Sequence, residues 1–419
     1  MSVPLVVSAV TCLGCGCICD DIEVVLDRSA IIETRHACAL GARWFGTGAA
    51  PTRARVDGKD VSVDEAVTKA AAILSNATRP RVLLGTDVSC ETYAEAVACA
   101  DLLHARLDAT SSPFTMATIL AIQERGIATA TLGEIRNRAD VVVFWGVDPS
   151  VDFPRYQSRV APDPVGTHVP NGRSSRTVIA VDIGDARGPS DADVRVALPK
   201  TAEIDTLIAL AALLEGADST DGVARTLADH LRRGRYVAIV SEVERGADNA
   251  GGRAHRLLAL GHALNVSGRG ALSLLRGRGN RCGAEAVMTR QTGYPSAIDF
   301  ASGVPRYRPH ARPSNAQHDA VLLVGEASDP AAGLSTLGDA PAVVIGPRAS
   351  EGPFSGARVT IDSATAGIHA SGTAFRMDDV PIPLKRVVSG PPDATMICEA
   401  LRHRLQSVLS VPLDPRSLA

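Results

Sequence analysis

Short, strongly apolar segments that alternate with helix-like stretches constrain the fold of this 419-residue chain most. Segments of this kind are residues 81–85, 140–146, 177–182, 236–240, 320–324 and 342–345. Uninterrupted apolar strands are typical of parallel sheets whose two faces are covered by helices. Ligands of such sheets bind outside the carboxyl ends of the strands. Asp148 and Asp182, which follow two of these strands, are therefore expected either to contact a ligand or to form turns.

The second informative feature is a group of cysteines near the N-terminus. Five of the nine cysteines lie between positions 12 and 38, and four of them have ligand-like spacing. These four, the cysteine quartet, are Cys12, Cys15, Cys19 and Cys38. Three ligands on one tight loop and a fourth from a distant turn suit a [4Fe–4S] cluster. Four-thiolate zinc and a metal-free loop with reduced thiols remain alternatives, and Cys17 is expected to point away from the quartet.

Composition excludes several classes of function. Apolar residues make up 45% of the chain and the net charge is −3, which indicates neither a nucleic-acid binder nor a membrane-surface protein. No basic leader precedes an apolar stretch, and no apolar run is long enough to span a bilayer. Clustered cysteines without a leader predict a reducing cytoplasm, with Cys90, Cys99, Cys282 and Cys398 as buried structural thiols.

The order of elements predicts an α/β protein with two doubly wound parallel-sheet domains and a small N-terminal cysteine-rich β unit. Residues 1–57 form this unit and pack with residues 367–385. One α/β domain uses residues 58–130 and 319–419, and the second uses residues 131–318. Within the second domain, residues 276–318 are rich in Gly, Pro and Arg and are expected to be irregular.

Several motifs in one order carry a specific resemblance over nearly the whole chain. In chain order, these motifs are Cys19-Asp-Asp-Ile22, Ala37-Cys38-Ala-Leu-Gly41, Trp145-Gly-Val-Asp-Pro149, Asn280-Arg-Cys-Gly-Ala284 and Gly367-Ile-His-Ala-Ser-Gly. With them the chain resembles the B subunit of formylmethanofuran dehydrogenase, a molybdopterin oxidoreductase related to formate dehydrogenase. The resemblance implies a formate dehydrogenase-like fold and a [4Fe–4S] cluster on the cysteine quartet. It also implies a tungsten or molybdenum pterin centre that interconverts carbon dioxide and formate.

One departure from that family decides the expected function. The family places a metal-ligating Cys or selenocysteine, followed by His, just before a helix that ends in Ala-Leu-Gln. Counting back from Gln123 places Phe114 at the ligand position and Thr115 at the histidine position, and no cysteine lies between Cys99 and Cys282. Phenylalanine has no lone pair for a metal, so we expect no bound pterin centre and no catalytic residue in this chain.

A scaffold without redox chemistry is most similar to the B subunit of the formyltransferase/hydrolase complex of methylotrophic bacteria. This resemblance implies a structural role in the conversion of formaldehyde to formate, with a cavity that admits formate. Its implied partners are the A subunit, which is zinc amidohydrolase-like, and the C and D subunits, which carry the formyltransferase. The alternatives are an active tungsten- or molybdenum-pterin subunit of formylmethanofuran or formate dehydrogenase, and an iron–sulfur subunit for electron transfer.

Overall fold

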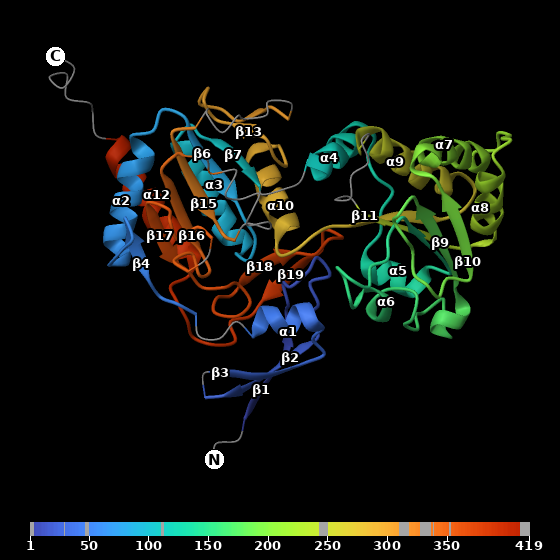
Figure 1. The fold of residues 1–419 in the computed structure, drawn as a ribbon, viewed down its shortest axis with the longest axis horizontal. Coiled ribbons are helices and arrows are strands. Elements are labelled where there is room, and N and C mark those ends of the chain that lie inside the picture. Colours follow the sequence, from blue (N-terminus) through green and yellow to red (C-terminus); the bar gives the residue numbers. More distant parts are fainter. Residues whose placement is uncertain are drawn as a thin grey trace.

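The structure is a computed structural model that describes most of the chain. The described residues are 4–28, 30–46, 50–109, 113–242, 250–309, 318–326, 337, 339–351 and 353–410. Two separate sheets dominate the fold, and a small N-terminal sheet projects below them (Figure 1). The predicted α/β architecture with parallel sheets is therefore confirmed. Within the described ranges, no helix combines the length and apolar character needed to cross a membrane.

The larger sheet contains nine strands among the described residues. Their order is β14 (Arg306–Tyr307), β13 (Ile298–Asp299), β7 (Arg106–Ala109), β6 (Pro80–Leu84), β15 (Ala320–Val324), β16 (Ala342–Gly346), β17 (Val359–Asp362), β4 (Ala54–Val56) and β5 (Lys59–Val61). The five central strands, β7 to β17, run parallel, and the strands at both edges are antiparallel. This arrangement explains why β15 and β16, at the centre of the sheet, are apolar and buried along their whole length.

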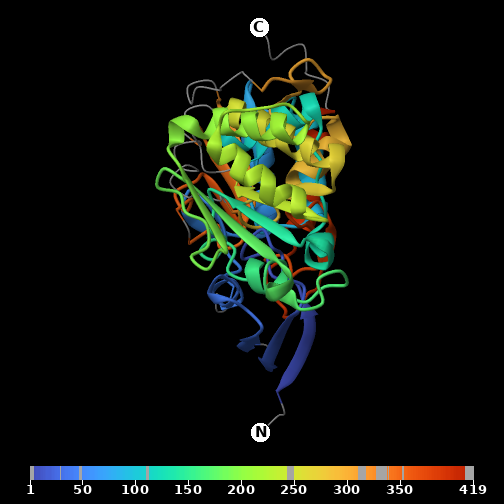
Figure 2. The same ribbon diagram turned by 90° about the vertical axis from the view of Figure 1, so that its right-hand side faces the viewer.

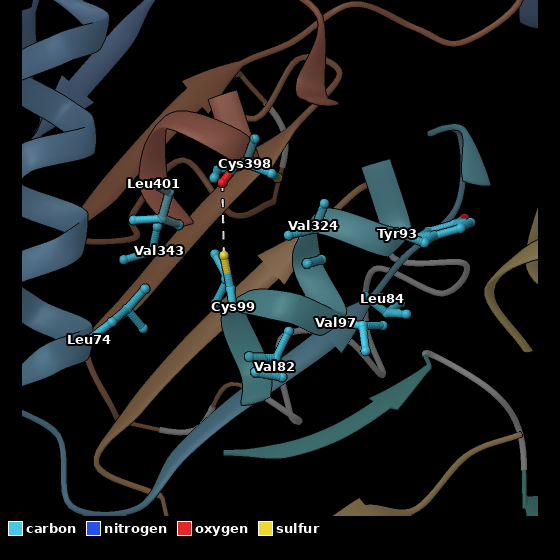
Figure 3. Close-up of a cluster of buried hydrophobic side chains, with 14 of the residues drawn as sticks. Leu74, Val82, Leu84, Tyr93, Val97, Cys99, Val324, Val343, Cys398 and Leu401 are labelled. Carbon is cyan, nitrogen blue, oxygen red and sulfur yellow. Dashed lines mark hydrogen bonds between the residues drawn. The ribbon is translucent and has the colours of Figure 1, made fainter. Parts of the chain in front are cut away.

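Four helices pack against the larger sheet or against one another beside it. They are α2 (Val63–Ser75), α3 (Cys90–Leu102), α10 (Arg281–Thr292) and α12 (Ala394–Leu409). Helix α2 begins at the capping residue Ser62, whose hydroxyl accepts the Glu65 N–H. Figure 3 shows the core between α3, α12 and the strands, where the Cys99 thiol lies 3.8 Å from the Cys398 carbonyl oxygen.

The smaller sheet is wholly parallel. Its order is β10 (Val194–Leu198), β9 (Thr177–Ile183), β8 (Val141–Trp145), β11 (Val237–Glu242) and β12 (Gly270–Leu275). Accompanying helices are α4 (Pro113–Arg125), α5 (Leu132–Arg138), α6 (Tyr156–Arg159), α7 (Glu203–Leu214), α8 (Gly222–Arg233) and α9 (Ala250–Ser267), with short 3₁₀ turns η1 (Gly172–Ser175) and η2 (Lys200–Ala202). Helices α7, α8 and α9 cover one face of the sheet, and α5 and α6 lie on the other (Figure 2).

The N-terminal sheet consists of β1 (Leu5–Val10), β2 (Ile22–Asp27) and β3 (Ala30–Arg35), and helix α1 (Ala39–Phe45) follows it. Both views show this sheet projecting from the body of the molecule (Figures 1 and 2). The cysteine loop between β1 and β2 packs on the hairpin of β18 (Gly372–Phe375) and β19 (Pro381–Leu384).

Two segments differ from the sequence-based expectation. Residues 281–292, expected to be irregular, form helix α10, which ends at Gly293 in the left-handed conformation. Helix α10 packs on α3, and β13 pairs with β7, so this part of segment 131–318 belongs to the larger sheet. Helix α4 conversely packs on α9, beside the smaller sheet. Neighbours distant in sequence decide these placements, and local composition does not report them.

Candidate functional site

The cysteine loop is a compact turn that backbone hydrogen bonds close. The Cys12 N–H donates to the Cys19 carbonyl at 2.9 Å, and the Ile18 N–H donates to the Cys15 carbonyl at 3.2 Å. Cys12, Cys15 and Cys19 are buried, whereas Cys38 is half-buried at the start of α1. The loop therefore holds three thiols of the quartet within one turn, as the spacing predicts.

The fourth thiol lies beside them. A methyl group built on Gly41 would meet the Cys12 sulfur at 3.2 Å and the Cys38 sulfur at 3.9 Å. Burial raises the pKa of the Cys12 thiol, and the neighbouring thiols Cys19, Cys15 and Cys38 raise it further. The structure thus brings the predicted quartet together in one buried place.

The donor set consists of four thiols, which zinc or a [4Fe–4S] cluster would use in different geometries. Zinc requires four thiolates within about 2.3 Å of one centre. Among the described residues, no group of three or more Cys, His, Asp or Glu side chains has the geometry to hold a metal ion. A cubane spreads its thiolates over four iron corners, so it requires gathered but separated sulfurs. Cys12, Cys15, Cys19 and Cys38 would be its ligands.

Cys17 differs from the expectation that it points away from the quartet. Its hydrogen bond with Cys15 and its burial raise the pKa of Cys17 well above the ordinary value. The same contact lowers the pKa of Cys15. The intervening Gly16 permits this tight turn, because a methyl group there would collide with the carbonyl oxygen of Arg276.

Two arginines form ion pairs with Asp20 and Asp21, the residues that follow Cys19. Arg155 donates through both terminal nitrogens to Asp21, at 2.7 and 2.6 Å, and Arg159 donates to Asp20 at 2.8 Å. Burial opposes ionisation of Asp21, but the hydrogen bond from Arg155 and the charge of Arg159 lower its pKa. Burial raises the pKa of Cys19, and the two guanidinium groups oppose that rise. An electrostatic clamp therefore fastens the loop to α6.

The opposite side of the loop touches the walls of a cavity. The Met377 N–H donates to the Gly16 carbonyl at 3.2 Å, and the Gly279 N–H donates to the Leu13 carbonyl at 3.2 Å. A cavity of about 580 Å³ lies between α4 and α10, beyond these contacts. Its lining includes Thr115, Thr118, Ile119, Ile122, Arg276, Cys282, Glu285, Thr289, Met377 and Asp379.

This cavity adjoins the start of α4, where the sequence predicts the lost metal-ligand position. Phe114 belongs to the first turn of α4, but its side chain lies outside the described part of the structure. Thr115 is buried and lines the cavity. Burial raises the pKa of Cys282, so that cysteine lines the wall as a neutral thiol. Arg276 forms close ion pairs with Glu285 and, at 3.7 Å, with Asp379.

A buried, hydrogen-bonded cluster lies at the carboxyl ends of two strands of the smaller sheet. Strand order changes direction between β8 and β11, which is where a ligand would enter. Here the Trp145 indole N–H donates to Glu203 at 2.9 Å, and Arg253 Nε donates to the same oxygen at 2.8 Å. Arg253 also reaches the Ser241 hydroxyl at 3.1 Å. We call Trp145, Glu203, Arg253 and Ser241 the switch-point plug.

The aspartates expected at this edge have structural partners. Asp148 accepts the Ser150 N–H at 2.9 Å in a turn. Asp182 accepts two hydrogen bonds from Arg195, at 2.7 and 2.8 Å, and one from the Gly188 N–H at 2.9 Å. Of the two roles that the sequence left open for Asp148 and Asp182, the structure supports turn and loop formation.

The larger sheet keeps an open switch point that sequence reasoning missed. Strand order reverses there between β6 and β15, and a cavity of about 320 Å³ is lined by Asp87, Glu326, Gly346 and Thr365. Burial and the neighbouring Glu326 raise the pKa of Asp87 well above its usual value. Both carboxyl groups follow predicted strands, so the strand-end rule that selected Asp148 and Asp182 would have found them.

Two proteins are related to this chain in sequence, and solved structures share its fold. The B subunit of tungsten-containing formylmethanofuran dehydrogenase 2 from Methanocaldococcus jannaschii is 31% identical, over 96% of this chain and 98% of that protein. Its counterpart from Methanococcus maripaludis is 29% identical, over 95% and 98%. No family model matches the chain.

The similar structure shows the fold. It is a chain of the formyltransferase/hydrolase complex (FhcABCD) from Methylorubrum extorquens, crystallised with methylofuran. The TM-score is 0.72 at 24% sequence identity, and the match covers 85% of this chain and 99% of that one.

Proposed function

We propose that this chain, which belongs to the family of formylmethanofuran dehydrogenase B subunits, is a non-redox structural component of a formyltransferase/hydrolase complex. The observation that carries the proposal is the pair Phe114-Thr115 where the family places its metal-ligating residue and histidine. The chain therefore lacks the donor that a tungsten or molybdenum centre requires.

The switch-point plug supports the same proposal. A pterin nucleotide bound to a doubly wound sheet would need the crevice at the carboxyl ends of the strands. In the smaller sheet, Trp145 is 1% exposed, and the Glu203–Arg253 ion pair lies at the carboxyl ends of β8 and β11. A pterin nucleotide bound at the smaller sheet would need this space free, whereas the switch point of the larger sheet stays open.

The partners follow from the fold and the family. We propose a formate dehydrogenase-like arrangement of the two parallel-sheet domains and the cysteine-rich β unit, located in the cytoplasm. In the complex the chain would bind the zinc amidohydrolase-like A subunit and the C and D subunits of the formyltransferase. The similarity to a chain of a complex crystallised with methylofuran supports this reading. The pathway is the conversion of formaldehyde to formate in methylotrophs.

We also propose that the cysteine quartet holds a [4Fe–4S] cluster. The approach of the Cys12 and Cys38 sulfurs at Gly41, with Cys15 and Cys19 buried in the same loop, supports it. The competing state is a loop of reduced thiols. Iron and acid-labile sulfide assays on the anaerobically purified complex, together with visible absorbance, distinguish the two states: about four of each per chain are expected.

Metal analysis of the purified complex tests the main proposal. We expect neither tungsten nor molybdenum above background, and one such atom per copy of this chain would overturn the proposal. The second candidate is an active tungsten enzyme, which the names of the two archaeal relatives favour. That candidate predicts formate-dependent dye reduction by the complex, and the structural reading predicts none.

A further inference from the structure

The clamp on the cysteine loop pairs two arginines with two aspartates, so it is neutral as a whole, and its arginines are the members that face Cys19. Arg155 precedes α6 and Arg159 ends it, and their side chains are 17% and 23% exposed. Arg159 contacts both carboxylates that follow Cys19, reaching Asp21 at 3.4 Å through Nε in addition to Asp20. Because these groups are largely withdrawn from solvent, salt and water screen them weakly.

A charge in this place has a consequence beyond holding the loop. A [4Fe–4S] cluster gains one negative charge when it is reduced, so nearby positive charge and N–H donors favour the reduced state. We propose that Arg159, with Arg155 in support, raises the reduction potential of a cluster on the cysteine quartet, and that Asp20 lowers it. This inference rests on the cluster proposed above. It assigns Arg159 and Arg155 an electrostatic role toward the cluster.

Substitutions of the arginine and of the aspartate in the clamp should shift the reduction potential in opposite directions. Arg159→Gln removes a positive charge and is expected to lower the equilibrium constant for reduction about tenfold, a shift of about −59 mV for a one-electron couple. Asp20→Asn removes a negative charge with almost no change in shape, so a shift of similar size in the opposite direction is expected. Arg159→Lys keeps the charge and should restore a potential close to that of the wild type.

The readout is a potentiometric titration of the whole complex, followed by electron paramagnetic resonance of the reduced cluster. All variants are reconstituted anaerobically with ferrous iron and sulfide. Arg173→Gln is the matched control, because it breaks a two-pronged Arg–Asp pair of 2.9 and 2.8 Å with Asp193 at η1, outside the cysteine loop. Its potential should equal that of the wild type.

Three results would overturn the inference. Equal potentials in the wild type, Arg159→Gln and Asp20→Asn would show that the clamp is mechanical only. Shifts in the same direction for Arg159→Gln and Asp20→Asn would indicate a disturbed loop and no electrostatic effect. Failure of the wild-type complex to take up a cluster would remove both this inference and the cluster proposal. That failure would leave the non-redox assignment untouched, since tungsten and molybdenum analysis decides it.

Discussion

Removing Glu203 from the switch-point plug should destabilise the protein strongly. Glu203 is 4% exposed and accepts hydrogen bonds from Trp145 and Arg253 on one oxygen. In Glu203→Ala, the Arg253 side chain, which is 14% exposed, would keep a buried charge without its partner. Such a change costs about 3–5 kcal/mol in free energy of unfolding. The Trp145 N–H would also lose its acceptor. Its cost is included in that range and is not added to it, because contributions of residues in one hydrogen-bond network are not additive.

The assay is urea unfolding of the purified protein, with fluorescence and far-UV circular dichroism as separate probes. The double variant Glu203→Met with Arg253→Met removes both charges and should cost clearly less than Glu203→Ala. Asp218→Ala is the matched control, because its pair with Arg225 at 3.2 Å is 92% and 53% exposed. That pair should contribute less than about 1 kcal/mol.

A cost for Glu203→Ala as small as that of Asp218→Ala would refute the reasoning. It would mean that water reaches Arg253 freely and that the crevice is open. A double variant as unstable as the single one would show that packing of the methylene groups, and not the ion pair, closes the crevice.

Three further outcomes are expected. Gly16→Ala should lower the iron content of the complex and cost about 1–3 kcal/mol, because its methyl group would overlap the Arg276 carbonyl; Gly222→Ala, with open space around it, is the control for urea unfolding and iron analysis. Stability should fall above pH 9, because burial raises the Cys99 pKa from 9.0 to about 12 and the unfolded chain therefore loses its proton first. Cys99 alone accounts for a loss of about 1.4 kcal/mol per pH unit, and other buried thiols such as Cys282 add to it. Between about pH 8 and pH 10, urea unfolding should therefore show a loss in Cys99→Ala that is smaller than the wild-type loss by about 1.4 kcal/mol. Tyr93→Phe should cost about 1–3 kcal/mol in urea unfolding, since its buried hydroxyl donates to the Gly85 carbonyl at 2.8 Å; a change below about 0.5 kcal/mol would contradict this.

The buried parallel strands could be predicted closely from the sequence. Segments 81–85, 140–146 and 177–182 correspond to β6, β8 and β9 within one residue at either end. A strand covered on both faces must be apolar along its whole length, so its signal is local and strong. Helix α10 gave no such signal, because its arginines and small residues show no clear apolar period and its packing on α3, β18 and β7 defines it.

The candidate site also has one part that the sequence predicts and another part that only the tertiary structure reveals. Cys12, Cys15 and Cys19 lie together because their spacing in one loop forces it, and the sequence shows that spacing directly. The pairing of Asp20 and Asp21 with arginines more than a hundred residues away depends on how α6 docks on the loop. No local pattern reports such docking. The plug around Glu203 was missed for the same reason, since its members come from β8, β11, α7 and α9.

The backbone contacts of the cysteine loop also determine when it can be completed. The carbonyls of Leu13 and Gly16 accept hydrogen bonds from the N–H groups of Gly279 and Met377. The ribosome synthesises these donors hundreds of residues after the loop. At about 5–20 residues per second, the first thiols of the nascent chain stay uncovered for tens of seconds. Any iron–sulfur carrier that loads this loop would therefore find it open throughout translation and closed soon after release.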